Sequence, residues 1–482
     1  MTSAALALPG TTALGETVSR KPLNIVFLVS DGMSAGVPPL AEALSRMMRN
    51  QGTFWQQLAE DPKTSHGLFD MASLSSVVTD SAAAASAWGS GCRVMNGVLN
   101  TYPDGTELKA LCRILQEHGR NTGLVSTARI THATPAGFFA MAPSRDLEEV
   151  IAGQYLQDGP MVLLGGGRKF FTSEGRQDRV NILSEFEAKG YRVVTNRDEL
   201  LNAKKGRVLG LFDEDHLPYT LDCQGDAKLT KEVPTLAEMA QSALDILAGE
   251  RKPFFLMIEA ARVDMAAHAN DAAGLLWDQL AFDDAIGKVL EFQKLYPDTL
   301  VVVSSDHGNS NPGLNGMGNG YNESPACFER LKSFKRTSSW IRTTIEKQEK
   351  ENRVFNAGTV AQLVREVSGC NLTWEEASSL VNAFKKKRVF DFSNQQKSFY
   401  GVLGQILGNH TGLGWTGVTH TSDWTLSMAR GPGQEDFGGL MKNTDFFHRV
   451  MALSGIDFRN PAYLVEVPKV ALPPVSLADP TG

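Results

Sequence analysis

The sequence of 482 residues contains few cysteines and no long hydrophobic run. Its five cysteines are odd in number and form no Cys-x-x-Cys pair, which argues against a disulfide framework and a thiolate metal site. No apolar run is long enough to cross a membrane. The net charge is −7 and no dense basic face is present, so we expect no nucleic acid as a specific partner.

The N-terminal segment 1–22 lacks a basic start. An apolar stretch at residues 4–10 is followed by small residues, as at the end of an export signal, but no lysine or arginine precedes Arg20. The segment is therefore either a plain leader or the remnant of a longer signal. We expect a remnant, which predicts a periplasmic or extracellular protein, whereas a plain leader predicts a cytoplasmic one.

Apolar runs rich in β-branched residues alternate with helical patterns along the chain. The runs predict buried parallel strands at residues 25–30, 123–127, 160–164, 254–258 and 300–304. A helical pattern, such as the one at residues 235–244, lies between successive runs. The alternation predicts an α/β fold with a mostly parallel sheet and helices on both faces.

Polar residues stand where several predicted strands end. Asp31, Glu259 and the pair Asp306 and His307 each follow a buried run. A single acid at such a place is often only a helix cap or a turn residue. Several of them are directed to one edge, because the carboxyl ends of parallel strands meet there and ligands of open α/β sheets bind there. The combination favours a metal site.

Histidines add to these acids. Asp264 and His268 are four residues apart, so on a helical turn both project from one face, and this pair suits zinc. A surface Asp–His pair is the plainer alternative, but this one directly follows a buried strand. His420 follows a Gly/Thr segment, and it is a candidate ligand only because the other candidate ligands are present. The remaining histidines have no comparable setting and are treated as ordinary: His66, His118, His216, His410 and His448.

These residues suffice for three cations. The carboxylate and imidazole groups can hold two zinc ions of mixed nitrogen and oxygen coordination. Asp31, Glu259 and the hydroxyl of Thr134 form an oxygen-only set for a harder ion such as Mg²⁺.

Ser81 opens an alanine-rich segment after a β-branched run. Because alanine is the strongest helix former, Ser81 is predicted to lie at a helix N-terminus, where an anion or a serine losing its proton is stabilised. The alternative is that Asp80 or Ser81 merely caps the helix.

Several motifs together resemble the alkaline phosphatase family. They occur in the family's order and cover most of the chain outside residues 309–409. Arg145 follows Thr134 by eleven residues, as the family's phosphate-binding arginine does. The motifs lie at residues 29–33, 79–91, 131–136, 165–168, 234–239, 258–268, 305–308 and 419–421.

The resemblance implies a three-layer sandwich and the hydrolysis of phosphate monoesters to alcohol and inorganic phosphate. Ser81 would become phosphorylated and Arg145 would bind the phosphate. Three cation sites are implied: a first site for zinc (Asp264, His268, His420), a second for zinc beside Ser81 (Asp31, Ser81, Asp306, His307) and a third for magnesium (Asp31, Thr134, Glu259). Partners would be small phosphate monoesters, and a homodimer is a further expectation.

Two residues depart from the family pattern. His132 stands where some members have an aspartate near the magnesium ion, and Met265 stands where some have a lysine or histidine that contacts phosphate through water. Both are expected to lie around the ligands rather than among them. They leave the ion of the third site open between Mg²⁺ and a softer ion such as Co²⁺.

The resemblance also divides the chain. Residues 23–308 and 410–470 would form the catalytic domain, and 471–482 a tail. The segment 309–409 is charged and carries helical patterns at 359–366 and 374–387, so it is expected to be a mainly helical insertion, as a crown or a dimer contact. Its basic run at 385–388 is expected to be a solvated helix face.

Other functions remain open at this stage. A phosphodiesterase, phosphonate hydrolase or sulfatase of the same superfamily is the nearest enzyme alternative. Sulfatases need a Cys or Ser in a C/S-x-P-x-R context, which the sequence lacks, and diesterases usually present a threonine nucleophile. A non-catalytic phosphate- or metal-binding protein is the alternative from another class.

Overall fold

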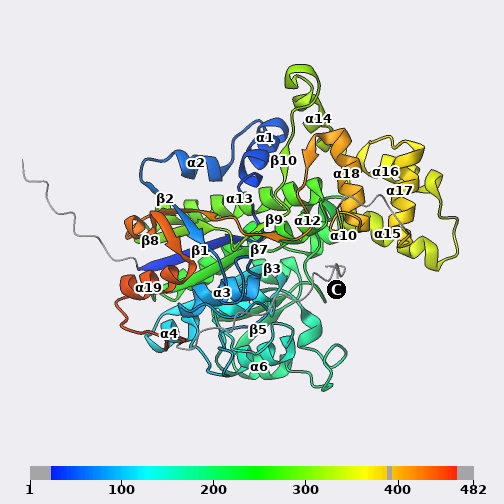
Figure 1. Ribbon diagram of the computed structural model, residues 1–482. Helices are drawn as coiled ribbons and strands as arrows, with labels where there is room; N and C mark the ends of the chain where they lie inside the picture. The colour runs from blue at the N-terminus through cyan, green and yellow to red at the C-terminus, as the bar shows by residue number, and fades with distance from the viewer. Residues whose placement is uncertain (1–22, 388–392, 464–482) are drawn as a thin grey trace, which may run out of the picture.

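The computed structural model describes residues 23–387 and 393–463. A ten-stranded sheet runs through the centre, and helices cover both of its faces (Figure 1). In spatial order the strands are β14 (Gly439–Lys442), β2 (Thr64–Asp70), β13 (Thr425–Arg430), β8 (Thr299–Ser304), β1 (Asn24–Ser30), β7 (Phe254–Ala260), β3 (Asn121–Arg129), β4 (Val162–Gly166), β6 (Arg207–Leu211) and β5 (Tyr191–Val194). Only β13 runs antiparallel to its neighbours, which confirms the predicted mostly parallel sheet.

The helices pack against the sheet in two layers. On one face lie α1 (Val37–Arg49), α11 (Leu236–Gly249) and α13 (Ala272–Leu295), and on the other lie α3 (Ser81–Ser90), α4 (Leu111–Glu117) and α19 (Asn443–Ser454). Alternate residues of β1 serve the two layers: Val26 and Leu28 face the first, and Phe27 and Val29 face the second. A strand buried on both faces must be apolar throughout, which is why β1 reads as a continuous hydrophobic run.

The remaining elements connect these layers or extend from them. The helices are α2 (Phe54–Glu60), α5 (Ala133–Gly137), α6 (Glu148–Asp158), α7 (Leu183–Ala188), α8 (Arg197–Leu201), α9 (Thr220–Gln224), α10 (Ala227–Glu232) and α12 (Arg262–His268). Four short strands pair in two small sheets, β9 (Gly308–Asn309) with β12 (His420–Thr421) and β10 (Gly313–Leu314) with β11 (Leu413–Gly414).

The segment 309–409 extends to one side of the sheet as a group of helices (Figure 1). They are α14 (Ser324–Glu329), α15 (Ser338–Lys350), α16 (Ala357–Ser368), α17 (Trp374–Phe384) and α18 (Phe399–Thr411), the last continuing past residue 409. Its role as a crown or a dimer contact stays a prediction, as does the division into domains. The predicted leader 1–22, the tail 471–482 and Arg388 of the basic run lie outside the described residues.

Two absences predicted from composition can be checked on the described residues. All five cysteines are free thiols, so none of the possible disulfide bridges forms. Across residues 23–387 and 393–463, every helix is too short or too polar to span a bilayer.

Candidate metal centre

The carboxyl ends of three adjacent strands bring three acids together. β1 lies between β7 and β8, and its residue Val29 is in register with Glu259. Asp31 directly follows β1, and Asp306 lies two residues beyond β8. Glu259 lies inside β7 rather than after it, contrary to the sequence prediction, because pairing with β1 continues as far as Ala260. All three acids are fully buried.

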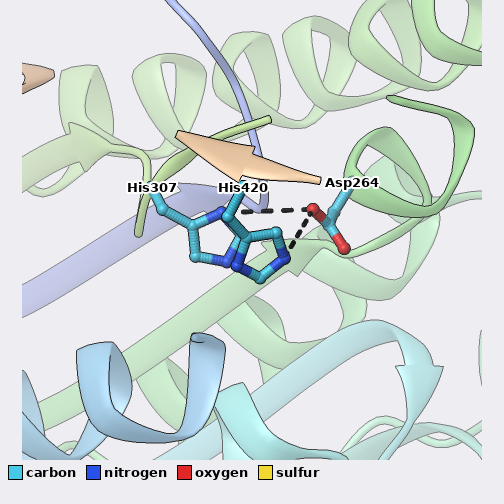
Figure 2. Close-up of side chains that lie close together, drawn as sticks. All are labelled: Asp264, His307 and His420. Carbon is cyan, nitrogen blue, oxygen red and sulfur yellow. Dashed lines mark ion pairs between the residues drawn. The ribbon is translucent and has the colours of Figure 1, made fainter. Parts of the chain in front are cut away.

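Asp264 and His268 lie on α12, which begins directly after β7. As predicted from their spacing, they share one face: Nε2 of His268 lies 3.3 Å from Oδ2 of Asp264. His420 reaches them through β12, whose pairing with β9 places it beside His307. The rings of His307 and His420 stack with centroids 3.6 Å apart next to Asp264 (Figure 2).

At the first site, possible ligand atoms of Asp264, His268 and His420 lie close together. A group whose possible ligand atoms all lie within 4.8 Å of one another consists of Asp264, His420 and His307. Nε2 of His420 lies 3.6 Å from Oδ1 of Asp264 and 3.1 Å from Nε2 of His268. The Nδ1 atoms are occupied elsewhere: that of His268 donates to the carbonyl of Val418 (2.7 Å) and that of His420 to the carbonyl of Thr79 (2.9 Å). Donation by Nδ1 leaves the lone pair on Nε2, which is the arrangement that supports metal-binding imidazoles.

The second site forms around His307, whose Nε2 contacts three groups. It lies 3.5 Å from Oδ1 of Asp31, 3.2 Å from Oδ2 of Asp306 and 3.2 Å from Oγ of Ser81. Oδ1 of Asp306 accepts from the backbone N–H of Gly32 at 3.0 Å, which fixes the carboxylate and leaves Oδ2 without a hydrogen bond.

Ser81 is the first residue of α3 and is 2% exposed. The cap of this helix is Asp80, whose Oδ1 accepts from the N–H of Ala83 at 2.9 Å. The serine hydroxyl is therefore not needed for capping, and it points to His307 instead. Ser81 thus lies at a helix N-terminus as predicted, and the capping role belongs to Asp80.

The third site lies on the other side of Asp31. Asp31, Glu259 and His132 form a group whose possible ligand atoms lie within 4.8 Å of one another. The hydroxyl of Ser126 donates to Glu259. Thr134 is the second residue of α5, which begins directly after His132, and its buried hydroxyl has no hydrogen-bond partner among the described residues.

Arg145 lies beside this third site. Its Nη1 lies 3.1 Å from Oδ2 of Asp80 and its Nη2 lies 2.9 Å from Nε2 of His132. The guanidinium group is therefore held one residue away from Ser81. Met265 lies apart from these contacts, and its sulfur accepts from Arg262 at 3.1 Å.

Several neighbours of these residues were not predicted from the sequence. Asn309 donates to Oδ1 of Asp264 at 2.7 Å, and the ring of His216 lies edge-on to that of His132 with centroids 5.2 Å apart. Ser126 is one of several polar residues in β3, so nothing in the sequence distinguishes it as a residue that supports Glu259. His216 has no setting in the sequence comparable to that of the predicted ligands, so its place beside His132 was not predicted.

The donor set fits divalent cations. Buried atoms without a hydrogen-bond partner include both carboxylate oxygens of Asp31, Oε1 of Glu259 and Oδ2 of Asp306. Burial raises the pKa of Asp31 well above its usual range, and Asp306 adds to the effect. Burial, then the charge of Asp264, raises the pKa of Asp306 to about 8. Buried acids that lack hydrogen-bond donors are compensated by bound cations in proteins.

His268 and Asp264 already compensate one another in part. Burial disfavours the charged imidazole, but the charge of Asp264 outweighs it and raises the pKa of His268 to about 9. Burial likewise disfavours the carboxylate, yet His268 holds the pKa of Asp264 well below its usual range. A cation in the first site would replace the proton of His268.

The chain is similar to known proteins of one family. A family model described as alkaline phosphatase matches residues 22–456. Alkaline phosphatase 4 of Bacillus subtilis is 31% identical over 438 residues, which span 88% of this chain and 86% of that protein. The crystal structure of Thermus thermophilus alkaline phosphatase is 33% identical, covers 92% of this chain and 93% of its own, and superposes with a TM-score of 0.85.

Proposed function

Because the chain belongs to the alkaline phosphatase family and is therefore a phosphoric monoester hydrolase, we propose that Ser81 is its nucleophile and that turnover passes through a phosphoserine. One observation carries this proposal. The Ser81 hydroxyl is buried at the start of a helix, is free of any capping role and lies 3.2 Å from Nε2 of His307.

The alkaline phosphatase family is metal-dependent, and this chain offers matching ligand groups. We propose zinc in the first site (Asp264, His268, His420) and in the second (Asp31, Asp306, His307). Magnesium is proposed for the third (Asp31, Thr134, Glu259), with Co²⁺ as the alternative. Such ions would withdraw charge from the phosphoryl group and lower the pKa of the Ser81 hydroxyl.

The chain's own residues account for the two displacements. In the first, Oγ of Ser81 forms a bond to phosphorus while the bond from phosphorus to the ester oxygen breaks, and the alcohol leaves with one proton. In the second, a water oxygen bonds to phosphorus and the bond to Oγ breaks. Inorganic phosphate departs and the Ser81 hydroxyl regains its proton.

Arg145 is proposed to bind the phosphoryl oxygens. Its planar guanidinium group can donate two parallel hydrogen bonds to one phosphate. Asp80 holds Nη1 at 3.1 Å and also accepts from the backbone N–H of Gly97 at 2.9 Å, so the arginine is oriented before substrate arrives. The N-terminal N–H groups of α3 add stabilisation of negative charge at the same place.

These groups address the phosphoryl end of the substrate only. We therefore expect broad specificity among phosphate monoesters. A tight preference for one alcohol would contradict this expectation.

The decisive experiment traps the covalent intermediate. Zinc-loaded protein is quenched in acid during turnover of a monoester, and peptides are mapped by mass spectrometry. We expect phosphate on Ser81 in the native chain and none in Ser81→Ala. Ser90→Ala is the matched control, because Ser90 lies on the same helix and bonds only to the carbonyl of Ser86. Phosphate on another residue would refute the assignment.

Arg145→Ala tests the phosphate clamp, and we expect it to raise KM and weaken inhibition by phosphate. If both stay unchanged, its role is refuted. Parallel assays of a monoester, a diester and a sulfate ester separate the alternative activities. Faster diester or sulfate hydrolysis would favour the related hydrolases, and no turnover by zinc-loaded protein would favour a non-catalytic binding protein.

A further inference from the structure

The side chains of Arg145 and His132 meet at the rim of the third site. Nη2 of Arg145 lies 2.9 Å from Nε2 of His132. A guanidinium group only donates hydrogen bonds, so Nε2 of His132 must be the acceptor. The single proton of a neutral imidazole then resides on Nδ1.

The other ring nitrogen of His132, Nδ1, has different surroundings. Nδ1 is buried and has no hydrogen-bond partner, and a ring nitrogen of His132 groups with the carboxylate oxygens of Asp31 and Glu259. A metal ligand must offer a lone pair, and a neutral imidazole has only one. We propose that Arg145 and a nitrogen-binding cation in the third site compete for the single lone pair of His132, which makes His132 a positioning residue for Arg145.

The ring of His132 is held in place by its neighbours. It packs edge-on against His216 at an interplanar angle of 81°. His216 contacts the guanidinium group of Arg129, which in turn pairs with Glu148 at 2.7 Å and with Asp215 at 2.8 Å. The outcome is therefore set by the place of the proton rather than by movement of the ring.

The kind of ion decides which partner uses the lone pair. Mg²⁺ prefers oxygen ligands, which Asp31, Glu259 and Thr134 supply, so His132 stays with Arg145. Co²⁺ and Zn²⁺ accept imidazole nitrogen readily. Such an ion takes the lone pair and frees Nη2 of Arg145 for a phosphate oxygen. This inference rests on the proposed function, since it assumes the cation site and the phosphate role of Arg145.

The test measures ion preference rather than activity. The affinity of the third site for Co²⁺ and for Mg²⁺ is determined in zinc-loaded protein by equilibrium dialysis with metal analysis. Removing the charge in Arg145→Ala raises both affinities alike, so their ratio isolates the lone pair. We expect the ratio of Co²⁺ to Mg²⁺ affinity to rise about threefold to tenfold in Arg145→Ala, the size of one net hydrogen bond.

A double-mutant cycle completes the design. On a His132→Ala background, Arg145→Ala is expected to leave the ratio unchanged. Arg168→Ala, which removes an arginine paired with Glu214 instead, is the matched control and is expected to leave the native ratio unchanged. If His132→Ala does not fold, the visible absorption spectrum of Co²⁺ bound to the Arg145→Ala protein tests the inference instead. We expect a stronger signature of nitrogen ligation in that variant than in the native chain.

Two results would overturn the inference: an Arg145→Ala ratio equal to that of the native chain, or the same rise without His132. These are distinguishable from failure of the proposed function. Protein that takes up no zinc or forms no phosphoserine refutes the proposed function. Protein that does both but shows an unchanged ratio refutes only the competition for His132.

Discussion

Two regions of this molecule bury acidic side chains, and they differ in whether the carboxylate oxygens accept hydrogen bonds. At the carboxyl edge of the sheet, Asp31, Glu259 and Asp306 have oxygen atoms without any hydrogen-bond donor. At α13, by contrast, the N-cap residue Asp271 and the helix residues Asp278 and Asp283 are equally buried but satisfied. Both oxygens of each of these three accept hydrogen bonds.

The acids of α13 tie other segments to that helix. Asp283 accepts from the backbone N–H groups of Phe54 (2.9 Å) and Trp55 (2.8 Å) at the start of α2. Asp278 accepts from the N–H and the hydroxyl of Thr220 at the start of α9, and Asp271 accepts from Ser338 at the start of α15. These acids therefore have a structural role at helix N-termini.

Burial raises the pKa of acids in both regions, so the direction of the shift does not separate them. Burial raises the pKa of Asp278 to about 7 and the pKa of Asp306 to about 8. Hydrogen-bond satisfaction does separate them. A buried carboxylate that accepts hydrogen bonds stabilises the fold, whereas one without hydrogen-bond donors is suited to binding a cation.

The largest expected difference between the two groups of buried acids is in catalysis. Asp31→Asn removes a proposed ligand of both the second and the third site, so we expect kcat/KM to fall by about 10²- to 10³-fold, the usual loss for an electrostatic group at the reacting centre. Asp278→Asn is the control and is expected to remain within about twofold of the native value. Steady-state kinetics with a monoester measure both. Equal losses in the two variants would contradict the distinction.

The next effect concerns metal removal. Stripping the ions with a chelator should lower the free energy of unfolding by about 2.7 kcal/mol for each ion removed, relative to protein at a free ion concentration a hundredfold above Kd. Asp278→Asn should show the same loss, because its acid binds no ion. Asp31→Asn should lose less. Denaturant unfolding with and without chelator measures these differences, and equal losses in all three proteins would speak against cation compensation.

A third effect breaks one clamp of α13. Asp283→Ala leaves the N–H groups of Phe54 and Trp55 without acceptors, so we expect the free energy of unfolding to fall by about 1–3 kcal/mol with kcat unchanged. The neighbouring Asp284→Ala removes only a partly exposed pair with Arg49 and is expected to cost less than about 1 kcal/mol. A loss of activity without a loss of stability in Asp283→Ala would reverse the assignment.

The last effect is a pH dependence. The pKa of Asp278 is raised from 3.8 to about 7, chiefly by burial, so the folded protein holds this proton more tightly than the unfolded chain. That contribution to stability is complete below about pH 4 and is lost as the pH rises to about 7. We expect the free energy of unfolding to fall more steeply across this window in the native chain than in Asp278→Asn. Parallel curves, measured by denaturant titration, would show that Asp278 is already ionised.

Much of the fold could be read from local patterns. Strands such as β1 and β8 were predictable because a strand buried on both faces must be apolar along its whole length. The pairing of Asp264 with His268 was predictable because helical spacing alone places them together. The end of β7 was not, because it depends on how far a neighbouring strand continues to pair.

By itself, the sequence determined which chemical groups this protein possesses and which of them are close neighbours along one strand or helix. Only the tertiary structure decided which lone pairs are available, because these depend on partners far away in the chain. Nε2 of His420 carries a lone pair because Nδ1 donates to the carbonyl of Thr79, and Nε2 of His132 is occupied because Arg145 donates to it. Spacing along the chain carries no record of such contacts, which arise from sheet register and packing.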